Sequence, residues 1–181
     1  MRTGWLLALA LMAAGCGAYR WSGEVPGELR TVSVPVFRNE SDVTELGSVA
    51  ARELAREFQR EGTFRLSARD EAALEIQGEI TGITRGNTAF GDRFTHRRRS
   101  EYDFSMQVKV SVIDRRAGKV LVDARKYTAR TTFVAEQDLL TAERDASGRL
   151  AEDLARQVVD DLVGGRLLAS AAQAETEVKD E

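Results

Sequence analysis

The stretch YDFSMQVKVSV, residues 102–112, alternates without a break between apolar and polar side chains. A side-chain period of two predicts a β-strand with one apolar and one polar face. The polar residues 114–119 carry Gly118 late in the run, which predicts a hairpin turn. A return strand is then expected from about Val120 to Phe133. Two long strands that are polar on one face are typical of an antiparallel sheet covered on one side only.

A third strand is predicted for residues 73–83, which also alternate. Its apolar face carries Leu74, Ile76 and Ile80. Gly78 and Gly82 fall in the same apolar register, which indicates either the close approach of a packed helix or a bulge.

Two shorter strands are expected nearer the N-terminus, at residues 31–37 and 64–67. The first should present Val32, Val34 and Val36 on one face. Because Pro35 has no N–H to donate, this strand should lie at a sheet edge or stop pairing at the proline.

Two amphipathic helices accompany the strands. The first begins near Asp42, which with Glu45 has the spacing of a capping box, although Thr44 is an alternative cap. Gly62 suits the left-handed position after its end. Its apolar stripe comprises Leu46, Val49, Ala50, Leu54 and Phe58. The second helix runs from about position 138 to 163 and stops at Gly164-Gly165. Its stripe repeats every four residues at Leu150, Leu154, Val158 and Leu162.

The order of elements is therefore β-α-(β)-β-β-β-α. Since both helices and all the longer strands have one apolar face, they can bury it only against each other. The sequence predicts an α+β fold in residues 31–165: a two-layer sandwich with two amphipathic helices packed on one face of a mixed, mainly antiparallel sheet.

The first sixteen residues have the pattern of an export signal. One basic residue, Arg2, precedes an apolar run of about ten residues, which is too short to span a bilayer as a helix. Small residues then lead to Cys16, an arrangement that resembles the bacterial lipoprotein box. That resemblance implies a signal peptide at 1–15 and acyl chains such as palmitate on Cys16. An ordinary signal peptide with an incidental cysteine is the alternative.

The flanks of the domain have tail-like compositions. Residues 16–30, with glycines and a proline, are expected to form a tether between the lipid and the domain. Residues 166–181 are expected to form a disordered C-terminal tail. Gly17, rather than the aspartate that retains enterobacterial lipoproteins in the inner membrane, favours the outer membrane, with the protein facing the periplasm.

Composition excludes several function classes. A formal charge of −3 argues against a nucleic-acid binder, which needs a basic surface. With one histidine and one cysteine, almost nothing remains for a metal site or a catalytic nucleophile. We therefore expect no metal, no cofactor and no catalytic residue. The composition favours a binding protein and not an enzyme.

One basic stretch, residues 85–99, separates two predicted strands and is the longest connection in the domain. Arginine binds phosphates with two parallel hydrogen bonds, and the neighbouring Phe90 and Phe94 would add apolar contact. A phosphorylated glycolipid such as lipid A offers that combination. The candidate binding residues are Arg93, Arg97, Arg98 and Arg99. The alternative is a solvated extension of the hairpin that keeps the sheet edge soluble.

Several segments together resemble the LptE family of lipopolysaccharide-assembly lipoproteins. They are GAYR after the lipoprotein box, TVSVPVFRNE at 31–40, EFQREGTFRL at 57–66, ALEIQGEI at 73–80 and RLAEDLA at 149–155. The resemblance implies two helices on a four-stranded mixed sheet and no catalysis. It also implies a plug inside an LptD-type outer-membrane β-barrel that helps the barrel assemble and binds lipopolysaccharide. Basic residues in strand-connecting loops of the family bind lipopolysaccharide, which adds weight to the four arginines.

Two other families share the opening strand and helix: LpoB-type activators of peptidoglycan synthases and CsgG-type secretion lipoproteins. An LpoB-type protein needs a long tether to cross the periplasm, whereas residues 17–30 reach at most about 50 Å. A CsgG-type pore needs hairpins with a lipid-facing apolar side, and the polar face of residues 102–133 counts against it. A partner-binding lipoprotein of either kind, without a role in lipopolysaccharide transport, is the alternative function.

Overall fold

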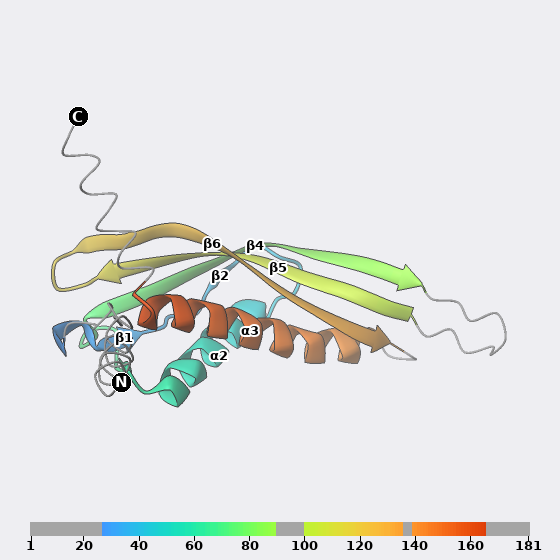
Figure 1. Ribbon diagram of the computed structural model, residues 1–181. Coiled ribbons are helices and arrows are strands. Elements are labelled where there is room, and N and C mark those ends of the chain that lie inside the picture. The colour runs from blue at the N-terminus through green and yellow to red at the C-terminus, as the bar shows by residue number, and fades with distance from the viewer. Residues whose placement is uncertain (1–26, 90–99, 136–138, 166–181) are drawn as a thin grey trace, which may run out of the picture.

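The computed structural model describes residues 27–89, 100–135 and 139–165. The described elements are the 3-10 turn η2 (Gly27–Leu29), the strands β1 (Thr31–Ser33), β2 (Arg38–Asn39), β3 (Arg65–Leu66), β4 (Leu74–Ala89), β5 (Ser100–Asp114) and β6 (Lys119–Ala135), and the helices α2 (Leu46–Glu61) and α3 (Leu139–Val163). Both helices lie on the same face of one open, mixed sheet (Figure 1). The α+β class and the placement of the helices agree with the prediction.

The sheet has six strands, in the order β3-β1-β4-β5-β6, with β2 also paired to β4. The expectation of four strands was wrong for two reasons: the predicted strand 31–37 is divided into β1 and β2, and the short strand expected at 64–67 joins the sheet as β3. Pairing stops at Ser33 before Pro35, as a residue without an N–H requires, and resumes in β2 at Arg38. The short strands pair in parallel, whereas the long strands β4, β5 and β6 pair antiparallel.

The core lies between the helices and the long strands. Alternate residues of β5 are buried from Phe104 to Val112, which confirms the strand predicted there. The predicted stripes of both helices are buried as well, with Val49 only half-buried. Gly62 ends α2 in the left-handed conformation, with φ of 84°.

The predicted capping box is wrong. Helix α2 begins at Leu46, and its N-cap residue Glu45 makes no side-chain hydrogen bond to the backbone. Asp42 is instead turned toward β4, where it pairs with Arg85. The helix therefore starts from a turn fixed by other residues.

Phe37, and not Val36, enters the core between β1 and β2. Val36 is 71% exposed, while Phe37 is 3% exposed. The ring of Phe37 lies directly on Gly78, where an added Cβ would be 2.2 Å from ring carbons. The backbone of Phe37 also lies close to Gly47 of α2, where an added Cβ would be 2.3 Å from the Phe37 carbonyl oxygen. The close approach predicted from Gly78 is thus real, but the approaching group is an aromatic ring.

A bulge in β4 reverses which residues face the helices. Ile80 pairs with Val108 and Gly82 with Gln107, so Thr81 is an extra residue in the ladder. Since one added residue shifts the side-chain period, Ile83 and Arg85 face the helices after the bulge. Gly82 consequently lies outside the apolar register expected for it.

Helix α3 closes the free edge of β6. Four polar residues spaced four apart along α3, namely Arg149, Asp153, Gln157 and Asp161, contact this strand. Asp153 accepts a hydrogen bond from the backbone N–H of Arg130, and Gln157 donates one to the Thr128 carbonyl. Arg149 reaches Thr131 and Thr132, and Asp161 reaches Arg125 and Tyr127. These contacts satisfy edge groups that would otherwise pair with another chain.

Glu75 is a buried carboxylate, although the alternation of residues 73–83 predicts it on the polar face of the strand. It is 1% exposed and accepts hydrogen bonds from Arg69, Arg115 and Gln77 at 2.8–3.0 Å. Burial acts to raise the pKa of Glu75, but these donors outweigh it and hold the pKa below its ordinary value. The cluster ties the start of β4 to the β5–β6 turn.

Candidate functional site

The lipidation residue and the lipopolysaccharide-binding residues predicted from the sequence lie outside the part of the chain that the structure describes. This holds for Cys16 and for Arg93, Arg97, Arg98 and Arg99, and also for residues 1–15, most of the tether and the tail 166–181. The structure does describe the strand ends between which residues 90–99 connect, namely Ala89 of β4 and Ser100 of β5.

Part of the predicted basic connection is strand. Residues 85–89 belong to β4 and pair with Ser100–Phe104 of β5, so the hairpin extends well beyond the helix layer (Figure 1). An aromatic group lies near its far end on the helix side. Tyr102 and Phe133 stack with their ring centroids 5.2 Å apart, and Phe104 meets Phe133 edge to face at 5.9 Å. These rings link β5 to β6 near the start of β5.

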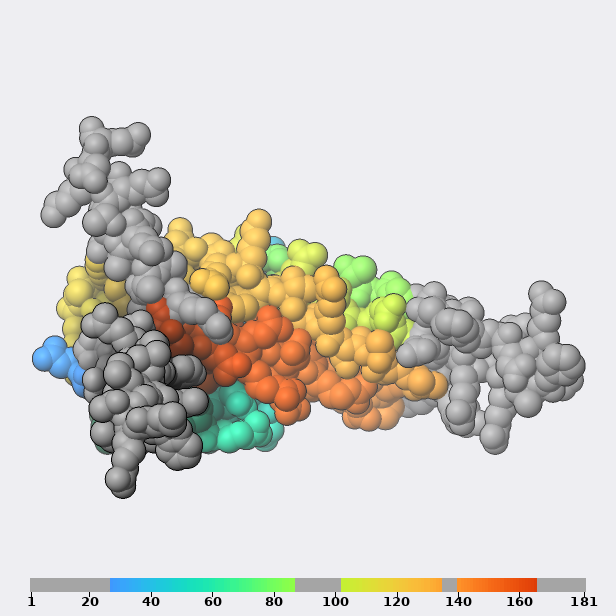
Figure 2. Space-filling model, viewed as in Figure 1, coloured from blue at the N-terminus to red at the C-terminus, as the bar shows by residue number. Residues whose placement is uncertain are grey.

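The sheet surface turned away from the helices, which we term the open face, is mainly polar, with Val120 and Val134 exposed near the two ends of β6. Its described members include Gln77, Glu79, Thr84, Asp103, Ser105, Gln107, Lys109, Lys126, Thr128, Arg130 and Thr132. Neighbouring strands place Thr84, Ser105 and Arg130 in one row, and Gly86, Asp103 and Thr132 in the next. A hollow of about 780 Å³ lies over these two rows, where Gly86 contributes no side chain. Figure 2 views the sheet along its edge, with β6 next to α3 and the open face turned toward the top of the picture.

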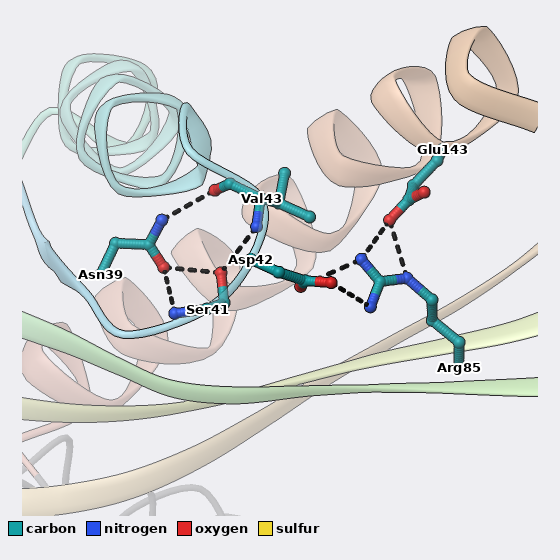
Figure 3. Close-up of polar contacts among 6 residues, drawn as sticks. All are labelled: Asn39, Ser41, Asp42, Val43, Arg85 and Glu143. Atoms are coloured by element: carbon teal, nitrogen blue, oxygen red, sulfur yellow. Dashed lines mark hydrogen bonds and ion pairs between the residues drawn. The ribbon is translucent and has the colours of Figure 1, made fainter.

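On the opposite side of the sheet, Arg85 joins three parts of the chain in a group that we term the Arg85 cluster (Figure 3). Its guanidinium contacts both carboxylate oxygens of Asp42, at 3.0 and 3.1 Å, and Oε1 of Glu143 in α3, at 2.5 and 2.8 Å. It also lies over the Phe104 ring, 5.6 Å from the centroid. A strand, a helix and the turn before α2 thereby meet at one side chain.

The turn that presents Asp42 is built by two polar residues (Figure 3). Asn39 Oδ1 accepts hydrogen bonds from the N–H and the hydroxyl of Ser41, at 3.0 and 2.6 Å. Asn39 Nδ2 donates to the Val43 carbonyl at 2.7 Å. Such side-chain bonds to nearby backbone are what favour Asn and Ser in turns. They fix the path of residues 39–43 and so the position of Asp42.

Electrostatics within the Arg85 cluster follow from these contacts. The hydrogen bond from Arg85 holds the pKa of Asp42 below its ordinary value. Burial acts to lower the pKa of Arg85, but hydrogen bonds from its guanidinium to Asp42 and Glu143 outweigh this and raise it. Asp42 and Arg85 are therefore both charged at neutral pH, and the arginine is already paired with two carboxylates.

The sequence predicts a basic connection over residues 85–99, and nothing in it separates Arg85 from the arginines that follow. The signal that distinguishes it is the bulge at Thr81, which turns residue 85 toward the helices. Among the described residues no group of three or more His, Cys, Asp or Glu side chains could hold a metal ion. The arrangement offers binding surfaces made of hydroxyls, amides and paired charges.

Comparison with known proteins identifies the family. The model of the LptE family, described as lipopolysaccharide-assembly, matches residues 29–162. The chain belongs to the LptE family. This family comprises lipopolysaccharide-assembly lipoproteins and not enzymes. No curated protein gave a significant sequence match.

Several solved structures are similar to this LptE-family chain at low sequence identity. A neuraminyllactose-binding hemagglutinin homolog from Helicobacter pylori is 12% identical, with a TM-score of 0.50 over 86% of this chain and 94% of that one. A minor lipoprotein from Acinetobacter baumannii is 15% identical, with a TM-score of 0.45 over 76% and 93%. Rare lipoprotein B from Shewanella oneidensis is 16% identical, with a TM-score of 0.36 over 82% and 98%. At these identities the likeness concerns the fold alone.

Within the part of the LptE-family chain that the structure describes, no helix has both the length and the apolar character needed to cross a bilayer.

Proposed function

We propose that this LptE-family protein is a lipoprotein of the outer membrane that occupies the lumen of an LptD-type β-barrel, helps it assemble and binds lipopolysaccharide in transit. In this proposal residues 1–15 are a signal peptide, and Cys16 carries the acyl chains that hold the protein on the periplasmic side. Residues 16–30 form a tether to the domain at 31–165, and residues 166–181 form a disordered tail. Two or more acyl chains are sufficient for a stable anchor.

The observation that carries the plug proposal is the open face. Three strands of fifteen to seventeen residues present hydroxyls, amides and charges on one uncovered side. The lumen of a large outer-membrane barrel is itself polar. A polar, water-tolerant surface of this kind matches such a wall through hydrogen bonds and bridging waters.

Binding of lipopolysaccharide is proposed for Arg93, Arg97, Arg98 and Arg99. They connect the far ends of β4 and β5, beyond the hollow that Arg130 lines on the open face. Guanidinium groups pair with phosphates through two hydrogen bonds, which is the interaction that the phosphates of lipid A offer. The described part of the open face contributes three further cations, Lys109, Lys126 and Arg130.

The barrel proposal is tested by purifying the tagged lipoprotein from outer membranes in mild detergent. A large, heat-modifiable β-barrel should copurify at a one-to-one ratio. A photo-crosslinking residue in place of Gln107, which is exposed in the middle of β5, should trap the same barrel. Recovery of a peptidoglycan synthase, or of no partner at all, would argue instead for the other lipoprotein function.

The lipopolysaccharide proposal predicts that reversing three charges, Arg97→Glu, Arg98→Glu and Arg99→Glu, weakens binding of purified lipopolysaccharide at least about tenfold, because charge-assisted hydrogen bonds to phosphate become repulsions. The thermal unfolding midpoint should not change. The control is the pair Arg65→Glu and Arg116→Glu, exposed arginines at the other end of the sheet. Equal affinities for the two variants would remove the arginine segment from the binding site.

A further inference from the structure

A groove of about 450 Å³ lies where the N-terminal ends of α2 and α3 meet beside the Arg85 cluster. We term it the helix-end groove. Its apolar lining consists of Val43, Leu46, Val49 and Leu140. Leu140 is 76% exposed, the most exposed of the large apolar side chains that the structure describes. An apolar pocket of this volume is large enough to receive side chains of a binding partner.

The rim of the helix-end groove is acidic on balance. Asp42, Glu45 and Glu143 line it, against Arg85 and Arg144. Arg85 is already paired with two carboxylates, so it does not attract a further anion. Glu45 is exposed and its carboxylate forms no cap to the helix, so it is accessible from the groove. A phosphorylated lipid would meet repulsion here, in contrast to the arginine-rich segment 90–99.

The walls of the groove are held in place without a ligand. Arg85 links β4 to the turn before α2 on one side and to α3 on the other. Asn39 and Ser41 fix that turn independently. Binding would therefore order little of this protein, and preorganised pockets of this kind tend to supply the energetically dominant contacts of an interface.

We propose that the helix-end groove is a docking site for a polypeptide segment that inserts a large apolar side chain between Val49 and Leu140 and carries a lysine or arginine beside it. The apolar side chain would cover the exposed Leu140. The adjacent cation would pair with Glu45 and with the outer side of Asp42, which is 69% exposed. This site goes beyond the proposed function, since it uses neither the open face nor the arginine segment.

The test places a photo-crosslinking residue at position 140 of the full chain in its membrane, and identifies the adduct by mass spectrometry. We expect a polypeptide adduct whose crosslinked residue lies within a few positions of a lysine or arginine. Glu45→Lys should reduce the adduct about threefold or more at low salt, because it replaces attraction with repulsion. The matched control Asp160→Lys, an exposed position at the other end of α3, should leave it unchanged.

Three results would overturn the docking proposal: a lipid adduct, no adduct, or a polypeptide adduct that Glu45→Lys does not affect. A compensating charge reversal at the partner's cation, combined with Glu45→Lys, should restore the adduct and thereby exclude a loss of folding. Crosslinking from Gln107 on the open face separates this test from that of the barrel. A barrel adduct at position 107 without a polypeptide adduct at 140 would reject the groove alone.

Discussion

Gly47→Ala is expected to lower the free energy of unfolding by about 2–3 kcal/mol, although alanine is the better helix former. An added Cβ at position 47 would lie 2.3 Å from the backbone oxygen of Phe37. A backbone atom cannot turn aside as the end of a side chain can, so the contact can be relieved only by moving α2 away from the segment between β1 and β2. The Phe37 N–H, which donates to the Gly47 carbonyl at 3.3 Å, would move with it.

The control for this prediction is a second helical glycine. Gly148 lies within α3, and a Cβ added there would meet nothing within 4 Å. Gly148→Ala should therefore stabilise the protein by about 0.5–1 kcal/mol through helix propensity alone. Urea denaturation of the two purified variants measures both effects. If both substitutions shifted the midpoint in the same direction, the close contact at Gly47 would have no energetic consequence.

The contact of Phe37 with two glycines shows where sequence patterns lose their power. Alternation identified β5, and three- and four-residue spacing identified the apolar stripes of α2 and α3. Both patterns were clear because long elements repeat their period several times. The run 31–37 is too short for this, and Val32, Val34 and Val36 suggested a face that continues past Pro35. The chain instead turns at the proline, exposes Val36 and buries Phe37 on Gly78. Tertiary contact decided the orientation there.

The position of Arg85 illustrates a second limit. A single extra residue at Thr81 inverts the period. Gly78 and Gly82 in the apolar register indicate a bulge as one of two alternatives, but the pattern does not tell at which glycine the bulge lies. If the period of β4 continued unbroken, Arg85 would belong to a continuous basic connection that ends at Arg99. With the bulge at Thr81, Arg85 faces the helices and joins β4 to α3. Similarly, the alternation places Glu75 at the surface, whereas Arg69, six residues before it, and Arg115, 40 residues after it, cover it.

Arg85→Ala is expected to cost about 2 kcal/mol of stability. Hydrogen bonds between charged groups contribute about 1.5–3 kcal/mol where they are shielded, and less where water reaches them. The Arg85 side chain is 37% exposed, but Glu143 is only 16% exposed and would lose its partner. The substitution also leaves two carboxylates facing each other across the empty site. Calorimetric unfolding of the full chain measures the loss.

The matched variant is Arg85→Lys, which keeps the charge but cannot bind Asp42 and Glu143 through one planar fork. It should recover about half of the lost stability. Hydrogen exchange should accelerate in residues 83–86 of β4 in the alanine variant more than in residues 74–77, since only the former depend on the Arg85 cluster. Uniform acceleration along β4 would indicate global destabilisation and count against a local role.

Acidification supplies an independent check on the same contact. Because the hydrogen bond from Arg85 lowers the pKa of Asp42 in the folded protein, relative to about 3.9 in an unfolded chain, their pairing stabilises the fold fully above that value. The stabilisation is lost as the pH falls through the lowered pKa, where Asp42 becomes protonated in the folded state too. The stability difference between the wild-type protein and Arg85→Ala should thus be constant from neutral pH to about pH 5 and shrink below about pH 4. A difference that instead stayed constant on acidification would mean that Arg85 stabilises the fold by its stacking on Phe104 and not through its carboxylate partners.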